Sequence, residues 1–261
     1  MERNRESNYI HRAGTRTEIM VSEEINILLR LIIAHLLTDF VLQPTSWVLD
    51  RMERRLRSVK LYMHAALTAV VAYILVARWE YWWLPVVIFV THLLIDIWKT
   101  YQPQQLKYFI ADQLMHFLVL LFIWLGLFNK WADFGNYVQA ISTNNKNLAL
   151  VIGYIIATWP LGILIGIATE KWRVESEVNT DGLAKAGLWI GLLERFLIFT
   201  FIIIDQYTAV GFLIAAKSIL RFNDKETNTQ KKTEYVLIGT LMSFSASVLL
   251  AIIIKKAMGV I

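Results

Sequence analysis

Four of the five histidines and three aspartates of this chain lie on apolar segments, at spacings that could bring them together. In the stretch Thr91–His116, two His/Asp pairs flank a short polar turn, and the members of each pair are four residues apart. Side chains at i and i+4 share one helix face, so each pair can point at one ligand. Ionisable groups in such apolar sequence are functional candidates by default. The full set comprises His35, Asp39, His64, His92, Asp96, Asp112 and His116.

Imidazole and carboxylate donors of this kind suit Zn, Mn or Fe. The chain has no cysteine, so any metal has to be held by His, Asp or Glu. Seven donors exceed the needs of one tetrahedral ion, which predicts either two ions or one ion with aspartates that orient the histidines. We expect zinc, as one or two ions. Two other uses remain open: a proton or ion pathway, and interhelical hydrogen bonding without any ion.

The segments that carry these residues have the composition of a membrane protein. Of 261 residues, 56% are hydrophobic, with 10 Trp and 13 Phe. Bilayer-spanning helices need about 20 mostly apolar residues, and by that measure the sequence predicts an all-α, polytopic transmembrane bundle of seven or eight spans. The segment 207–222 is short and could be re-entrant. The predicted spans are 25–43, 61–78, 82–99, 105–128, 148–170, 187–204, 207–222 and 235–255.

Loop charges predict the orientation of these helices. Lysine and arginine gather in the loops 44–60, 100–107, 171–186 and 222–234. With eight spans these loops share one side, which the positive-inside rule makes cytoplasmic. The seven His and Asp residues then fall in the cytoplasmic half of the bilayer.

The order of polar and apolar segments predicts four regions. Residues 1–24 form a polar tail without the apolar core of a signal peptide, and translation could begin at Met1 or at Met20. Residues 25–128 form a four-helix domain that holds all of the helix-embedded histidines. A polar extracytoplasmic loop at 129–147 separates this domain from a second helical half at 148–261.

Four motifs give the chain a family resemblance. The runs AHLLTDFVLQ, THLLIDIWK and FIADQLMH, with a lysine ahead of a lone histidine in KLYMH, resemble domain-of-unknown-function 3307, a family of bacterial integral membrane proteins. The resemblance covers about residues 25–125 and implies no activity. The His/Asp pattern is also similar to that of inner-membrane proteins described as metal-dependent hydrolases, and more loosely to zinc phospholipase C and P1-type nucleases.

If hydrolysis is the chemistry, each residue can be given a role. His35, His92 and His116, with Asp96 or Asp112, would hold the metal, which lowers the pKa of bound water toward neutrality. Asp39 or His64 would then be the general base or would orient a ligand. The substrate would be phosphorylated or lipid-linked, and four cations could hold its phosphate: Lys60, Lys99, Lys217 and Arg221.

The second half carries a separate group of charges. Glu194 and Arg195 interrupt an apolar helix, while Lys217 and Arg221 lie four residues apart on the next one. The plainer interpretation is an intramembrane network in which Glu194 and Glu234 neutralise two of the cations. The alternative is an anion or headgroup pocket.

Function classes other than hydrolysis also remain open. An ion- or proton-coupled transporter would need a polar path to both faces, and the outer half offers few polar residues. A membrane anchor or sensor could recruit a cytoplasmic partner through the basic loop Arg51–Lys60. Contact with membrane lipid is expected, and the loop lacks the fold and interleaved aromatic residues of a nucleic-acid-binding segment.

Overall fold

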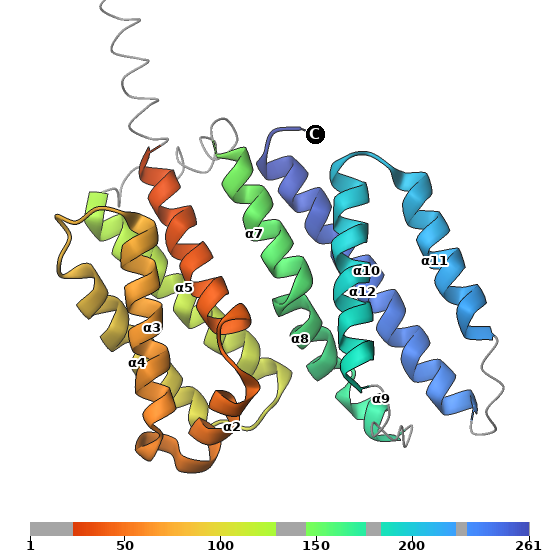
Figure 1. Cartoon of the computed structure of the whole chain (residues 1–261), viewed down its shortest axis with the longest axis horizontal. Coiled ribbons are helices and arrows are strands. Elements are labelled where there is room, and N and C mark those ends of the chain that lie inside the picture. Colours follow the sequence, from red (N-terminus) through yellow and green to blue (C-terminus); the bar gives the residue numbers. More distant parts are fainter. Residues whose placement is uncertain (1–22, 129–144, 176–183, 223–228, 261) are drawn as a thin grey trace, which may run out of the picture. The chain divides into compact units, whose positions relative to one another are not determined.

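The computed structural model describes residues 23–128, 145–175, 184–222 and 229–260, and every regular element among them is a helix (Figure 1). The all-α prediction is therefore confirmed. The predicted polar tail and most of the predicted 129–147 loop lie outside the described residues.

The predicted count of seven or eight spans is not supported. Four helical segments are long and apolar enough to cross a membrane: Val59–Val76, Leu106–Phe128, Lys146–Ala168 and Glu234–Ala257. A fifth is obtained if the bent pair Glu23–Val41 and Thr45–Arg57 counts as one span. Helix α4 (Leu84–Thr100) has only 17 residues and α11 (Tyr207–Phe222) only 16. Helix α10 (Ala184–Ile203) carries Glu194 and Arg195 in its middle.

The described chain divides into two compact units. The first takes in the described residues up to Tyr101, together with Asp112–Ile152 and the segment from Lys256 onward. The second comprises Gln102–Ala111 and Gly153–Lys255. The boundaries fall inside α5 (Leu106–Phe128) and α7 (Lys146–Thr158).

The first unit is built on a helix at 23–36, followed by α3 (Val59–Val76), α4 and the greater part of α5. Small side chains on α3 let it approach α4 closely, since Ala65, Ala69 and Ala72 are all buried. Ser58 caps the start of α3 by accepting a hydrogen bond from the Leu61 amide. A left-handed residue, Ala77, ends the helix.

The first helix changes direction at its end. Residues Leu37–Val41 form a π-helical turn, η1, in which the Leu42 amide donates to the Leu37 carbonyl. Pro44, extended at φ −66° and ψ 146°, then precedes α2 (Thr45–Arg54) and a short 3₁₀ turn, η2 (Arg55–Arg57). The two helical pieces meet at 82°. Proline favours an extended conformation before a new helix, which explains the break.

The second unit also contains a broken helix. Helix α7 ends at Thr158, and α8 (Pro160–Ala168) begins with proline, so the last carbonyls of α7 lose their intrahelical partners. The buried Arg195 of α10 replaces them, because its guanidinium donates to the Ala157 and Thr158 carbonyls at 2.8 Å each. Helix α9 (Glu170–Glu175) follows α8.

Two ion pairs of the second unit connect its remaining helices. Lys217 of α11 lies 2.5 Å from Glu194 of α10, which confirms the predicted pairing of that glutamate. Lys255 of α12 (Thr229–Ala257) lies 2.5 Å from Asp205, in the turn between α10 and α11. Hydrogen bonds from Lys255 and Tyr207 hold the pKa of Asp205 below its ordinary value. The predicted pairing of Glu234 stays a prediction.

The contact between Arg195 and Gly162 predicts a difference between two glycines on α8. A Cβ at Gly162 would collide with the Arg195 guanidinium, whereas a Cβ at Gly166 would meet nothing within 4 Å. We expect Gly162→Ala to displace Arg195 from two buried carbonyls and to lower the free energy of unfolding by about 2–4 kcal/mol. Thermal unfolding in detergent measures this.

Gly166→Ala is the matched control, because it makes the same chemical change four residues away on the same helix. It should leave the unfolding temperature unchanged or raise it slightly, since alanine favours helix more than glycine does. Equal effects of the two substitutions would contradict the assigned role of Arg195.

Candidate metal centre

All seven predicted His and Asp residues lie in the first unit and are buried or nearly so, at side-chain exposures of 9% or less. His35 and Asp39 come from the end of the first helix and η1, and His64 from the second turn of α3. His92 and Asp96 lie near the end of α4, whereas Asp112 and His116 lie near the start of α5. The structure therefore brings together residues that are up to 81 positions apart in sequence, as the spacing and loop charges predicted.

The closest group of donor atoms joins three helical segments. The Nε2 atoms of His64 and His92 lie 3.0 Å apart. Asp39 Oδ1 lies 3.4 Å from the first of these nitrogens and 3.5 Å from the second. The three atoms thus form a triangle of nitrogen and oxygen atoms, and its shortest side is a hydrogen bond between the two imidazoles. With both nitrogens deprotonated, all three atoms could bind a cation.

The π-helical turn η1 positions the aspartate of this triangle. Single π turns occur often at functional sites. Asp39 lies inside η1 and its Oδ1 is 3.5 Å from His35 Nδ1. The two residues are four apart, so they point to the same side of the first helix.

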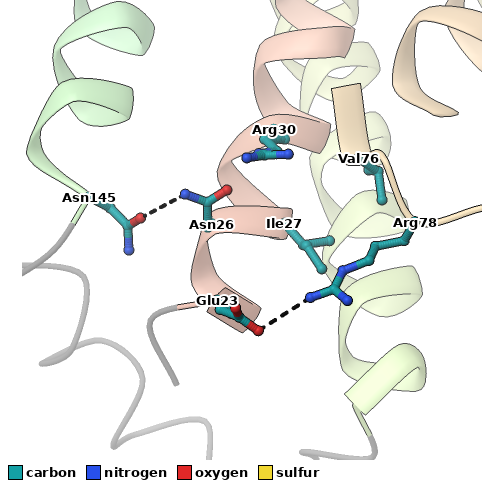
Figure 2. A pocket seen from close by; sticks show the side chains of 7 residues that line it. All are labelled: Glu23, Asn26, Ile27, Arg30, Val76, Arg78 and Asn145. Atoms are coloured by element: carbon teal, nitrogen blue, oxygen red, sulfur yellow. Dashed lines mark hydrogen bonds and ion pairs between the residues drawn. The ribbon is translucent and has the colours of Figure 1, made fainter. Parts of the chain in front are cut away.

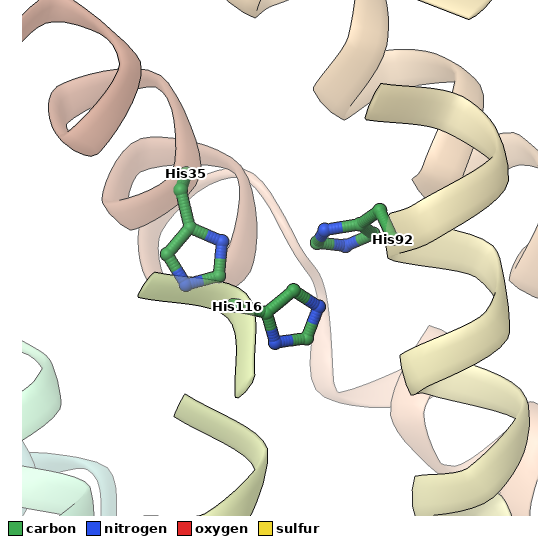
Figure 3. A group of neighbouring side chains, drawn as sticks. All are labelled: His35, His92 and His116. Atoms are coloured by element: carbon green, nitrogen blue, oxygen red, sulfur yellow. The ribbon is translucent and has the colours of Figure 1, made fainter. Parts of the chain in front are cut away.

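A second group of donors lies beside the first. The rings of His35, His92 and His116 surround a common space (Figure 3). Ring centroids are 4.7 Å apart for His35 and His116, and 4.3 Å apart for His92 and His116. One donor atom from each of these three lies within 4.8 Å of the others. Asp112 and Asp96 form a further group of the same kind with His116.

His116 has one nitrogen committed and one available. Its Nδ1 lies 3.0 Å from the backbone carbonyl oxygen of Asp112, four residues earlier in the same helix. A carbonyl only accepts, so Nδ1 carries the proton and Nε2 keeps its lone pair. That Nε2 is buried without a hydrogen-bond partner. This is the tautomer that a histidine ligand to a metal adopts.

Several other polar atoms of the cluster are buried without a hydrogen-bond partner. They include one oxygen of each aspartate and the second nitrogen of His64: Asp39 Oδ1, Asp96 Oδ2, Asp112 Oδ1 and His64 Nδ1. Buried polar side-chain atoms normally find a partner, so a concentration of exceptions in one place calls for an explanation.

Two residues of the centre were not predicted from sequence. Arg51 of α2 lies 2.9 Å from Asp96 Oδ2, with only 11% of its side chain exposed. Gln113 Oε1 lies 3.2 Å from His35 Nε2, while its amide donates to Asp112 Oδ2. Gln113 follows Asp112 in sequence, which could have indicated it. Arg51 was counted only as loop charge, because the direction of α2 depends on the break at Pro44.

The predicted phosphate-binding cations are dispersed. Lys60 lies over the ring of Trp47, 5.4 Å from its centroid. Lys99 is close enough to Asp112 and Asp96 to interact with both electrostatically. Lys217 forms its ion pair in the second unit. The side chain of Arg221 lies outside the described residues. The substrate-binding role of these four stays a prediction.

Comparison with known proteins gives one result. Residues 27–158, half of the chain, match the family model described as "Protein of unknown function (DUF3307)". No curated protein and no solved structure matches the chain. The matched segment contains all seven His and Asp residues of the cluster as well as Arg51 and Gln113.

The contact between Arg51 and Asp96 predicts a strong coupling. Arg51→Met would leave a buried carboxylate without its cation, which typically costs about 3–5 kcal/mol. We expect a lower unfolding temperature for Arg51→Met and a partial recovery in the double variant Arg51→Met/Asp96→Asn, since the second change removes the stranded charge. A double-mutant cycle from thermal unfolding measures the coupling.

The control is Arg54→Met on the same helix, because 66% of the Arg54 side chain is exposed. Its effect should be small, as expected for a surface ion pair. Additive effects of the Arg51 and Asp96 substitutions would show that the two groups do not interact.

Proposed function

The chain belongs to the DUF3307 family, whose description assigns no activity, and from that premise we propose that it is an integral membrane metal-binding protein. Asp39, His64 and His92 would hold one divalent transition-metal ion, with Zn²⁺ as the best match to the donor set. The observation that carries this proposal is the triangle of buried donor atoms at 3.0, 3.4 and 3.5 Å.

The dimensions of the triangle match a tetrahedral zinc site. Zinc binds nitrogen and oxygen ligands at roughly 2.0–2.2 Å, which places two ligands of a tetrahedron about 3.3–3.5 Å apart. Direct hydrogen bonds between the same atom types are shorter, at about 2.7–3.2 Å. Two of the three separations here exceed that range. A cation at the centre would explain both the spacing and the lone pairs that converge on it.

Charge balance also supports a bound cation. The cluster holds three carboxylates, of which Asp96 is neutralised by Arg51. Lys99 lies close enough to Asp112 to stabilise its negative charge electrostatically. Among the described residues, Asp39 faces only histidines. Isolated carboxylates are costly in an apolar interior, so a divalent cation beside Asp39 would stabilise the fold as well as fill the site.

The remaining donors could orient the three ligands or bind a second ion. His35 and His116 lie beside the triangle, and His116 presents an unprotonated Nε2. Asp112 lies against His116, with Nδ1 and Oδ1 separated by 3.7 Å. In this arrangement Asp39 and His64 become ligands, whereas the sequence predicted that one of them is the general base or orients a ligand. His35 and His116 would then be positioned to accept a proton from water.

We propose metal-dependent hydrolysis of a phosphorylated or lipid-linked substrate as the reaction. A cavity of about 10 Å³, which is room for about one water molecule, is lined by His35, His92 and His116 and by mostly apolar side chains. Of the three proposed ligands only His92 lines it. When bound, the metal would lower the pKa of a water that reached it from this cavity. The cations of α2 and η2 at the same end of the helices would attract an anionic substrate, and their charge favours the cytoplasmic side of a bacterial inner membrane.

The metal assignment predicts a definite composition. Protein purified in detergent should contain about one equivalent of zinc or a similar metal, measured by elemental analysis. Asp39→Asn and His92→Ala should each reduce this content at least tenfold, because each removes one of three ligands. Removal of the metal with a chelator should lower the unfolding temperature of the wild type.

Asp50→Asn is the matched control for Asp39→Asn. It neutralises an aspartate of the same unit that pairs with Arg54 and Ser58 outside the cluster. Metal content should not change in this variant. Equal metal content in all four proteins, each folded, would reject the site, and a Co²⁺ derivative without the absorption of a tetrahedral complex would reject its geometry.

Hydrolysis is tested separately from binding. Turnover of a phosphate ester or a phospholipid should be abolished by a chelator and restored by Zn²⁺. His116→Gln should reduce kcat by roughly 10²–10⁴-fold if this residue transfers a proton, with much of the metal retained. If the protein contains its full metal content but turns over none of these substrates in a chelator-sensitive way, it binds metal and does not catalyse this reaction.

A further inference from the structure

A polar cleft lies at the start of the first helix (Figure 2). His35 and Asp39 of the candidate metal centre lie toward the other end of that helix. The volume of the cleft is about 290 Å³, and its lining combines two arginines, two asparagines and one glutamate with apolar side chains: Glu23, Asn26, Ile27, Arg30, Val76, Arg78 and Asn145. These residues belong to the first unit, at the start of the helix at 23–36 and the end of α3. We propose that this cleft binds the phosphate group of an anionic phospholipid.

The charges of the lining favour an anion. Arg30 and Arg78 outnumber Glu23, the one acid among the lining residues. Arg30 uses one nitrogen to donate to the Leu75 carbonyl at 3.1 Å. A guanidinium has five N–H donors in a planar fork, so the remaining donors of Arg30 match two oxygens of one phosphate.

The two contacts that hold Arg78 are weak enough to be replaced. Arg78 lies 3.2 Å from Glu23 and 3.8 Å from Glu80, and the three side chains are exposed, at 43%, 65% and 57%. Exposed ion pairs of this kind contribute little, because water screens them. A phosphate accepts stronger, charge-assisted hydrogen bonds and can take the place of the glutamates. The cleft is thus preformed on the Arg30 side and adjustable on the Arg78 side.

A hydrogen-bonded pair of asparagine side chains also lines the cleft and fixes its shape. Asn26 Nδ2 donates to Asn145 Oδ1 at 3.2 Å, across 119 residues of sequence. Asn26 lies one helical turn before Arg30, so both residues present the same face. The Asn145 side chain is buried. This long-range contact keeps the cleft open toward the arginines.

The surroundings indicate a lipid rather than a soluble ester. Trp79 and Trp82 follow Arg78 in the connection to α4 and are 61% and 74% exposed. Exposed tryptophans near the end of an apolar helix are typical of the headgroup layer. Tyr73 holds this connection against α3, since its hydroxyl donates to the Trp79 carbonyl at 2.9 Å. The volume, at the low end of the roughly 300–1,000 Å³ of small-molecule sites, takes a headgroup and leaves the acyl chains outside.

Native mass spectrometry of the full chain in a neutral detergent tests the proposal. The probes are phosphatidylglycerol and inorganic phosphate, with affinities from titration. Arg30→Gln and Arg78→Gln should each weaken binding of the first phosphatidylglycerol roughly tenfold, as expected for loss of a charge-assisted hydrogen bond. Arg173→Gln, which removes the same charge from an exposed position of α9 in the second unit, should not change it.

Each outcome decides the question. If both cleft variants weaken the binding of phosphatidylglycerol, and inorganic phosphate does not compete with it, the result supports the lipid as the occupant of the cleft. Competition by phosphate at equal concentration, itself lost in Arg30→Gln, supports the phosphate site but overturns the lipid as its occupant. Equal affinities in Arg173→Gln and both cleft variants overturn the site. If Arg30→Gln fails to fold, Arg78→Gln and Arg30→Lys decide instead, because the first alters an exposed side chain and the second keeps the charge.

Discussion

The burial of three carboxylates within an apolar helical unit is the constraint on which the first half of this protein depends. An ionised carboxylate loses its hydration when it is buried, and that loss has to be offset by a cation or by hydrogen-bond donors. Arg51 does this for Asp96. Asp39 has three imidazoles at 3.4–3.5 Å and lies on a π turn that points it toward them. The break at Pro44 turns α2 toward the cluster, and this brings Arg51 next to Asp96.

Parts of the centre could be predicted from sequence because helix geometry alone determines them. His92 with Asp96, and Asp112 with His116, share helix faces by their spacing. The distribution of lysine and arginine predicted that all seven residues lie on the same side of the bilayer. The π turn at Leu37–Val41 was not predictable, since no residue type specifies it. The role of Arg51 was missed for a related reason, because the path of the chain after Pro44 depends on tertiary contacts.

The span count was the main error in the predicted fold, and its cause is physical. A hydropathy scan treats every apolar run as a span, whereas α4 and α11, with 17 and 16 residues, fall short of the about 20 that a span needs. The break at Trp159 leaves Lys146–Ala168 as one candidate span. Such breaks are tolerated in apolar surroundings only where other groups satisfy the freed backbone. Arg195 does so for the end of α7. Gly162 of α8 makes room for this side chain.

A comparison of the two units strengthens the case for a metal. In the second unit, the cations Arg195, Lys217 and Lys255 contact their protein partners at 2.5–2.8 Å, which is the distance of direct, charge-assisted hydrogen bonds. In the first unit, Arg51 and Asp96 form an ion pair at 2.9 Å. The histidine–aspartate contacts are longer than all of these, at 3.4–3.7 Å. The same chain therefore brings other charged groups into direct contact with their partners. The wider separation around Asp39 is what a shared ligand would impose, since atoms that bind one cation stay apart by the width of its coordination sphere.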